Sequence, residues 1–423
     1  MGGVVRFPRL LSLVFTGALL MLSSGPSFAS SGVTITREGW WTPLGVIVGP
    51  DGTAYIGDLS GRGVSVVPAG ATTPSRILAT DLSTSGIGLA GDGTLYLDGT
   101  DLNTRQELIG VIPVGADGVT RTIPVSPGSH LIAVAADGTV YVPNYGSGTV
   151  SVIPPGGDAI ARDITVGAGP REVAVAKDGT AYVTSQVAGT VSVIPPGAAS
   201  VSRTIQVSSV SGHTDNPHGI AVGPDGSVYV ADVTGNAIAV IKPGGTAVAY
   251  RVPVKDPKEV AVGADGSVYA LATAQNLSVI RPGGTEVALG VATSASPGHL
   301  AVAANGSVLI TNPEEHAVSV LGPELLRPIA ATTAPAQSPT HSPAAAPSQQ
   351  MESSGGFADL LGSMPIVLGA SVLAVLVAAA AVIVAGRRRR QRAILEAPVW
   401  SLEQLDPEQA IDSETAGGSG KRP

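Results

Sequence analysis

The chain has 423 residues, no cysteine, 44% hydrophobic residues and a formal net charge of −8. The lack of cysteine excludes disulfides, thiolate metal sites and cysteine nucleophiles, so stability must come from packing. The acidic balance gives no support to a nucleic-acid-binding surface.

Residues 1–29 have the three parts of a secretory signal peptide in the required order. Arg6 and Arg9 precede an apolar stretch over 10–22, and Ser27-Phe28-Ala29 has the small-x-small pattern of a cleavage site. A buried core helix is the alternative for such an apolar stretch. The sequence predicts export of the mature chain.

A seven-unit repeat occupies residues 30–327. Each unit has an apolar stretch, an Asp-Gly or Asn-Gly pair and an alternating strand, and later a second strand similar to Val191-Ser192-Val193-Ile194. The pairs recur every 40 to 47 residues and begin at Asp51, Asp92, Asp137, Asp178, Asp225, Asp265 and Asn305. Asp-Gly between two alternating runs is a strong hairpin signal, for which we expect a two-residue turn with positive φ at both positions. Several short strands in a unit of this length predict a β-propeller blade.

The ends of the repeat predict how the ring closes. The seventh unit has three strands and no convincing fourth, while an unassigned strand from Val33 to Arg37 precedes the first unit. We therefore expect an all-β, seven-bladed propeller in which the N-terminal strand completes the last blade. A tyrosine four residues after the anchor is expected to pack between blades, with Leu309 in its place in the seventh unit; the tyrosines are Tyr55, Tyr96, Tyr141, Tyr182, Tyr229 and Tyr269.

Two units are longer than the others. The second has extra residues over 99–105, including Asp101, and the connection from the fourth to the fifth is extended over 208–216, including His213 and Asp215. One insertion joins strands two and three of a blade, and the other joins strand four to the next blade. Both connections leave the same face of a propeller, so this face is the predicted binding side.

The start of each inner strand lies on that same face. The residues seven positions before each anchor include His130, Arg171, His218 and Lys258, and those that follow add Glu172, Glu259 and His299. The alternative is that these are solvated loop residues and rim salt bridges. We predict a ligand-binding face that comprises His130, Arg171, Glu172, His218, Lys258, Glu259, His299, Asp101, His213 and Asp215.

The C-terminal part predicts a membrane anchor. A Pro/Ala/Ser/Thr-rich spacer over 328–364 precedes a charge-free apolar segment within 365–386, long enough for one transmembrane helix. A cytoplasmic tail, 387–423, then begins with the stop-transfer arginines Arg387, Arg388, Arg389, Arg390 and Arg392. An arginine run can also form a nucleic-acid patch, but here it adjoins the apolar segment. The expected localisation is a bacterial cell membrane, single-pass type I, with the propeller outside.

The units resemble YVTN and NHL-type propeller repeats of bacterial cell-surface proteins. Ala181-Tyr182-Val183-Thr184-Ser185 and Val228-Tyr229-Val230-Ala231-Asp232 carry the resemblance. The resemblance implies the propeller fold and no particular activity, because this fold hosts binding modules and enzymes alike. The domain also resembles the external sensor propeller of actinobacterial receptor kinases, although the 37-residue tail is too short for a kinase.

Two functions remain open. One is a noncatalytic binding, sensing or adhesion module with a protein, glycan or small-molecule partner, no cofactor and no metal. The other is an extracytoplasmic enzyme, because Pro217-His218-Gly219-Ile220 is similar to a strand start of virginiamycin B lyase. That resemblance implies catalytic roles for His218, Glu259 and His299 and a metal-holding carboxylate. Lys258 and Arg171 would repel such an ion, and Glu259 and His299 belong to different units.

Overall fold

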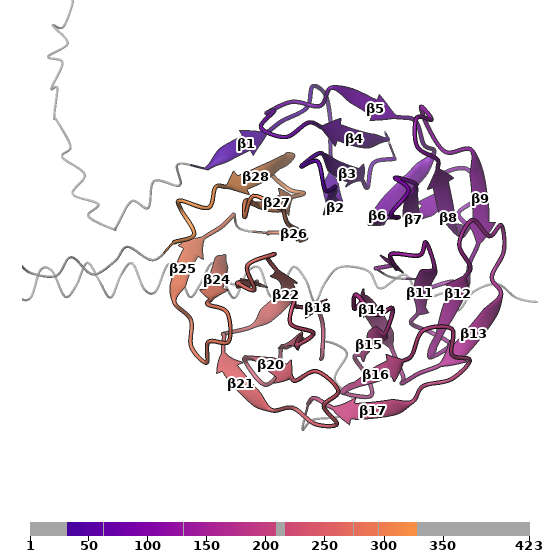
Figure 1. Cartoon of the computed structure of the whole chain (residues 1–423). Helices are drawn as coiled ribbons and strands as arrows, with labels where there is room; N and C mark the ends of the chain where they lie inside the picture. The colour runs from indigo at the N-terminus through magenta and orange to yellow at the C-terminus, as the bar shows by residue number, and fades with distance from the viewer. Residues whose placement is uncertain are drawn as a thin grey trace, which may run out of the picture. The chain divides into compact units, whose positions relative to one another are not determined.

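The computed structural model describes residues 32–327, except residues 62, 130, 209–215, 274 and 295. This part of the chain folds into strands joined by turns and loops, and the strands form seven sheets of four. Figure 1 shows the sheets as blades around a common centre. The predicted all-β, seven-bladed propeller is therefore confirmed.

Each sheet is antiparallel, and in blades one to six its strands follow chain order. Blades one to three contain β2 (Pro43–Val48), β3 (Ala54–Asp58), β4 (Val64–Val67), β5 (Arg76–Leu78); β6 (Leu82–Leu89), β7 (Leu95–Asp101), β8 (Glu107–Ile112), β9 (Arg121–Pro124); β10 (Ala133–Val134), β11 (Val140–Asn144), β12 (Thr149–Ile153) and β13 (Arg162–Thr165). Blades four to six contain β14 (Pro170–Val175), β15 (Ala181–Ser185), β16 (Thr190–Ile194), β17 (Arg203–Gln206); β18 (Ile220–Val222), β19 (Val228–Asp232), β20 (Ala237–Ile241), β21 (Tyr250–Pro253); β22 (Pro257–Val262), β23 (Val268–Ala272), β24 (Asn276–Ile280) and β25 (Leu289–Ala292). The seventh blade contains β26 (Leu300–Val302), β27 (Val308–Asn312), β28 (Ala317–Leu321) and β1 (Val33–Ile35).

The N-terminal strand closes the ring as predicted. β1 pairs antiparallel with β28, with Val33 opposite Val320 and Ile35 opposite Val318. Ile35 is only 2% exposed and packs in the cluster between the seventh and first blades. In Figure 1 the indigo β1 lies beside the orange β28, so the two ends of the described chain meet in one sheet.

The Asp-Gly pairs turn the chain between the two inner strands of each blade, but not by the expected turn. In the first blade Gly52 has a φ of 81°, whereas Asp51 is not among the residues with positive φ. Gly52 N–H donates to Gly49 C=O at 2.9 Å, which closes a turn that ends in one left-handed glycine. Asp51 Oδ1 accepts the N–H of Thr53 at 3.0 Å, so the aspartate stabilises the turn through its side chain.

The hydrophobic core is divided into seven clusters, one at each blade interface. Tyr182 of the fourth blade packs with Ile220 and Val228 of the fifth, and the other repeated tyrosines occupy the same kind of position. Five of the six are buried and Tyr55 is half-buried, which confirms their role in packing. Leu309 takes this place between the seventh and first blades.

The chain separates into two compact units, 1–334 and 335–423, and every described residue belongs to the first. Among the described residues, no helix is long and apolar enough to span a membrane. The predicted signal peptide, spacer, transmembrane helix, arginine run and tail lie outside those residues, so they stay predictions.

Candidate functional site

The insertion in the second blade mostly extends its sheet. Gly99, Thr100 and Asp101 belong to β7 and pair with β6. Asp101 Oδ1 accepts the N–H groups of Asn103 and Thr104, both at 2.8 Å. These backbone hydrogen bonds lower the pKa of Asp101 and keep its carboxylate ionised. The structure thus gives Asp101 a role in shaping the turn.

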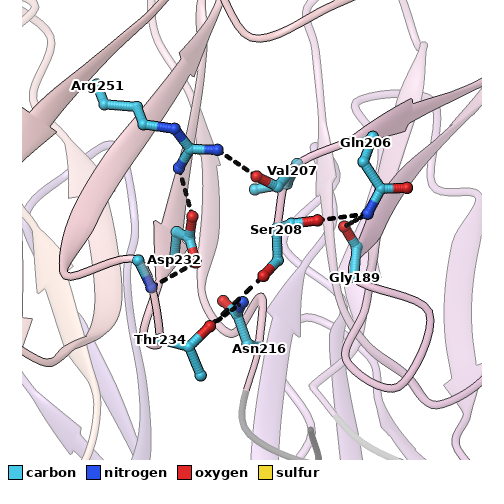
Figure 2. A network of polar contacts seen from close by, with 9 residues as sticks. Gly189, Gln206, Val207, Ser208, Asn216, Asp232, Thr234 and Arg251 are labelled. Atoms are coloured by element: carbon cyan, nitrogen blue, oxygen red, sulfur yellow. Dashed lines mark hydrogen bonds and ion pairs between the residues drawn. The ribbon is translucent and has the colours of Figure 1, made fainter. Parts of the chain in front are cut away.

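The second insertion begins and ends in one polar network (Figure 2). Thr234 Oγ1 lies 3.4 Å from Ser208 Oγ and accepts a hydrogen bond from Asn216 Nδ2 at 2.6 Å, so one hydroxyl binds both ends of the insertion. Arg251 reaches the same place from β21, pairing with Asp232 and donating to the carbonyl of Val207. His213 and Asp215 lie within the insertion, outside the described residues.

His218 follows this network directly, and a close backbone approach sets its position. Gly219 N–H donates to the carbonyl of Lys258 in the next blade at 2.9 Å. A Cβ at position 219 would lie 2.8 Å from that carbonyl and 2.9 Å from the Cα of Glu259, so only glycine fits there. The fifth blade therefore lies close against the sixth, and His218 is brought beside Glu259.

Register shifts at the start of two inner strands influence which side chains lie at the rim. The β14–β15 pairing shifts between Pro170 and Val173, and the β22–β23 pairing shifts between Pro257 and Glu259. A bulge changes the strict alternation of side chains and redirects one of them. These irregularities coincide with the sequence pairs Arg171-Glu172 and Lys258-Glu259.

Three potential ligand groups converge at the ring's inner edge. The side chains of Glu172, His218 and Glu259 place one nitrogen or oxygen each within 4.8 Å of the others. His218 Nδ1 lies 3.4 Å from Glu259 Oε1, and both side chains are more than nine-tenths buried. Arg171 and His299 are their electrostatic neighbours. We call these five residues the rim cluster.

The two carboxyl groups of the rim cluster differ in protonation. Burial and the charge of Glu259 raise the pKa of Glu172 well above its usual value, against the effect of Arg171. Burial would also raise the pKa of Glu259, but His299, His218 and Arg171 together lower it. Two nearby carboxylates cannot both ionise easily, so Glu259 holds the charge and Glu172 the proton. Burial lowers the pKa of His299, together with the charges of Arg171 and His218 and against the charge of Glu259.

Two polar atoms of the rim cluster are buried without a hydrogen-bond partner among the described residues. They are Arg171 Nε and Glu172 Oε2, whereas His218 Nδ1 has the 3.4 Å contact with Glu259 Oε1. A cavity of about 190 Å³ opens beside them, with Arg171, His218, Glu259 and His299 among its lining residues. Buried polar groups normally have partners, so this cavity is the candidate binding site.

The structure brings together most, though not all, of the predicted face. One cavity is lined by Arg171, His218, Lys258, Glu259 and His299. Glu259 and His299 therefore lie at the same site, although they belong to different blades. Asp101 belongs to the second blade, away from these residues in the fold. The remaining predicted residues, His130, His213 and Asp215, lie outside the described part of the chain.

A second buried polar group was missed from the sequence. Asp98 is 1% exposed on β7, and its carboxyl accepts hydrogen bonds from Ser129 Oγ at 2.8 Å and Ser85 Oγ at 3.1 Å. Glu107 Oε2 accepts the N–H of Ser129 at 2.7 Å. Asp98 lies in an ordinary strand pattern, but its charge at a buried position could have signalled a network.

Comparisons with known proteins agree with this fold. The NHL repeat family matches residues 214–241, the segment that contains His218 and the first three strands of the fifth blade, β18, β19 and β20. A search of curated protein sequences finds no significant match.

Solved structures match over most of the propeller. They include hydrazine synthase of Kuenenia stuttgartiensis, with a TM-score of 0.60 and 19% identity, over 68% of this chain and 97% of that one. Virginiamycin B lyase from Staphylococcus aureus has a TM-score of 0.56 and 15% identity, over 69% and 98%. The WD40 β-propeller domain of Doa1 has a TM-score of 0.55 and 13% identity, over 68% and 96%. These low identities establish a shared fold alone.

Proposed function

We propose that this distant NHL/YVTN-type β-propeller is a noncatalytic binding, sensing or adhesion module, anchored to the bacterial membrane with its ring outside the cytoplasm. The observation that carries the proposal is that two buried atoms at the rim, Arg171 Nε and Glu172 Oε2, have no hydrogen-bond partner within the described part of the chain. The sequence features of the two ends support export and anchoring.

The geometry limits what the rim binds. The cavity of about 190 Å³ is smaller than the roughly 300–1,000 Å³ of sites that enclose whole small molecules. It fits one polar group of a larger ligand, such as an acidic side chain of a protein or an acidic sugar. Arg171, which lines the cavity, can donate to an anionic oxygen. We propose that an acidic group of an extracytoplasmic protein or glycan binds here.

The rim proposal is tested by two matched pairs of substitutions in the full chain. Arg171→Gln with Lys258→Gln removes two charges from the rim of blades four and six. We expect the affinity for a partner captured by crosslinking on intact cells to fall at least tenfold, about 1.4 kcal/mol, because both residues line the cavity proposed for the acidic group. The measurement is the dissociation constant for that partner.

The control pair, Asp178→Asn with Asp265→Asn, lies in the hairpin turns of the same two blades and should leave the affinity unchanged. Equal loss from both pairs would place the site elsewhere. Protease added to the intact cells should remove the ring and the binding together. Protection of the ring from protease would contradict the proposed topology.

A metal-dependent lyase activity is the second candidate function. The residues Glu172, His218 and Glu259 provide the carboxylate and imidazole donors that zinc or manganese accepts, with one potential ligand atom of each within 4.8 Å of the others. When bound, such an ion would supply Lewis-acid assistance. Against it, the positive charge of Arg171 acts directly on both carboxyl groups.

Divalent ions distinguish the two functions. Under the binding proposal, millimolar magnesium, manganese or zinc should leave the melting temperature of the chain unchanged, because the positive charge of Arg171 beside the two carboxyl groups opposes a divalent ion. An ion present at 100 times its dissociation constant would stabilise the folded state by about 2.7 kcal/mol. A rise of several degrees with one ion, lost in Glu259→Gln but kept in Asp265→Asn, would establish the metal-dependent alternative.

A further inference from the structure

A second cavity lies between the seventh and first blades, at the end where the hairpin turns are. Its volume is about 570 Å³, and it is lined by turns and strands of both blades. We call it the seam cavity. Its apolar lining includes Ile35, Ala54, Val67, Ala303, Leu309 and Val320.

The same place between the second and third blades holds a much smaller space of about 230 Å³. Strand register shows that the two places are equivalent. Leu309 pairs with Val320 as Tyr96 pairs with Val111. Tyr96 and Arg121 are among the residues that line the smaller cavity.

Two changes at the ring closure enlarge the seam cavity. The tyrosine of the other six blades is replaced by Leu309, which removes an aromatic ring from the interface. In the second blade Arg121 lies opposite Val111. In the seventh blade the corresponding position, opposite Val320, is occupied by Val33. Val33 is 49% exposed and cannot cover the interface with a polar head group.

In the second, third and fourth blades an arginine at this position ties the blade to the next one, whereas Tyr250 and Leu289 occupy the position in the fifth and sixth blades. Arg121 donates to the carbonyl of Gly157 at 2.8 Å, and Arg162 and Arg203 make corresponding bonds at 3.2 and 3.1 Å. β1 comes from the opposite end of the chain and has valine at that position. The seam is therefore the junction between blades that lacks both the tyrosine side chain and the arginine side chain.

The polar part of the seam cavity is acidic. Asp51 and Glu324 contribute carboxylates, and Asn305 and Ser307 contribute neutral polar groups. No lysine, arginine or histidine is among the described residues that line it. Hydrogen bonds from Thr53 lower the pKa of Asp51, so its carboxylate is ionised at neutral pH.

We infer that the seam cavity binds a small organic amine with an apolar body, whose ring or branched chain lies against Leu309 and whose ammonium group faces Asp51 and Glu324. The volume falls within the range of small-molecule sites, unlike that of the rim cavity. The apolar walls favour binding of the apolar part of the ligand, because its surface is removed from water there. The exposed carboxylates favour a positive charge modestly. This site is on the opposite face from the rim and is independent of the function proposed there.

The test uses 2-phenylethylamine, 2-phenylethanol and phenylacetate as probes of the full chain, with dissociation constants from ligand-observed NMR. The amine should bind two- to fivefold more tightly than the alcohol, as expected for exposed ion pairs, and phenylacetate should bind more weakly than the alcohol. Leu309→Tyr introduces the aromatic side chain found at this position in the other blades, which should fill the cavity and weaken the binding of all three probes at least tenfold. Leu309→Met conserves volume and should retain binding.

A further pair of substitutions tests the two carboxylates of the seam cavity. Asp51→Asn with Glu324→Gln should remove the preference for the amine over the alcohol while retaining alcohol binding. If Leu309→Tyr shows no cooperative melting, Ala69→Phe, at an exposed turn of the cavity lining, should block the same site. Unchanged binding in the folded blocking variant, equal affinity for the amine and phenylacetate, or no binding of any probe by the full chain would overturn the inference.

Discussion

Replacing Arg37 by methionine is expected to lower the stability of the ring by about 3–5 kcal/mol. Arg37 follows the closing strand β1, and its guanidinium lies 3.2 Å from Asp58 of the first blade. The side chains are 7% and 0% exposed, so the substitution leaves a buried carboxylate without its counter-charge. The melting temperature should fall by on the order of 10 °C, measured by circular dichroism at pH 7.

Two controls isolate the buried charge as the cause. Arg76→Met breaks an ion pair with Asp117 at 3.7 Å whose side chains are 48% and 98% exposed, so its effect should be small. Adding Asp58→Asn to Arg37→Met should recover much of the loss, because the amide carries no charge. If Arg37→Met melts like Arg76→Met, the pair does not stabilise the closure.

The number of blades and their closure could be predicted because both depend on local, repeated signals. An Asp-Gly pair between two alternating runs indicates a turn, and the interval between successive pairs indicates the length of a blade. The closing strand from Val33 followed from counting strands in the seventh unit. The turn type was wrong, because Asp51 stabilises the turn with its side chain and leaves the positive φ to Gly52.

The candidate site could be predicted only in part, because its geometry depends on contacts between blades. The sequence placed His218 and Glu259 on one face, since each lies at the start of an inner strand, seven and six residues before its Asp-Gly pair. It could not predict their convergence, which depends on the close approach at Gly219 and on the register shift before Glu259. The sequence also identified Leu309 as an exception, whereas the enlarged cavity depends as well on Val33 from the other end of the chain.

The buried network around Asp98 gives the pH dependence of stability a specific source. Burial and the charge of Glu107 raise the pKa of Asp98 to about 7, although hydrogen bonds from Ser129 and Ser85 act in the opposite direction. The unfolded chain loses this proton near the ordinary value of 3.8. Between these values the unfolded state releases the proton and the folded state retains it, so stability falls as pH rises.

We therefore expect Asp98→Asn to stabilise the ring at pH 8 and to have little effect at pH 4. At pH 4 the folded parent already has a neutral carboxylic acid, and the amide can keep hydrogen bonds to Ser129 and Ser85. At pH 8 the parent carries the full cost of a buried carboxylate, on the order of 4 kcal/mol. The melting temperature of the variant should then exceed that of the parent by several degrees.

The control is Asp117→Asn, since the side chain of Asp117 is 98% exposed, and this variant should melt like the parent at both pH values. A benefit of Asp98→Asn that is equal at pH 4 and pH 8 would show that packing, not ionisation, is the cause. Loss of stability at pH 8 would mean that the ionised form of Asp98 is the one that the ring requires. The pH-dependent difference between the two variants thus measures the free energy associated with one buried proton, separately from all other groups that titrate in the same range.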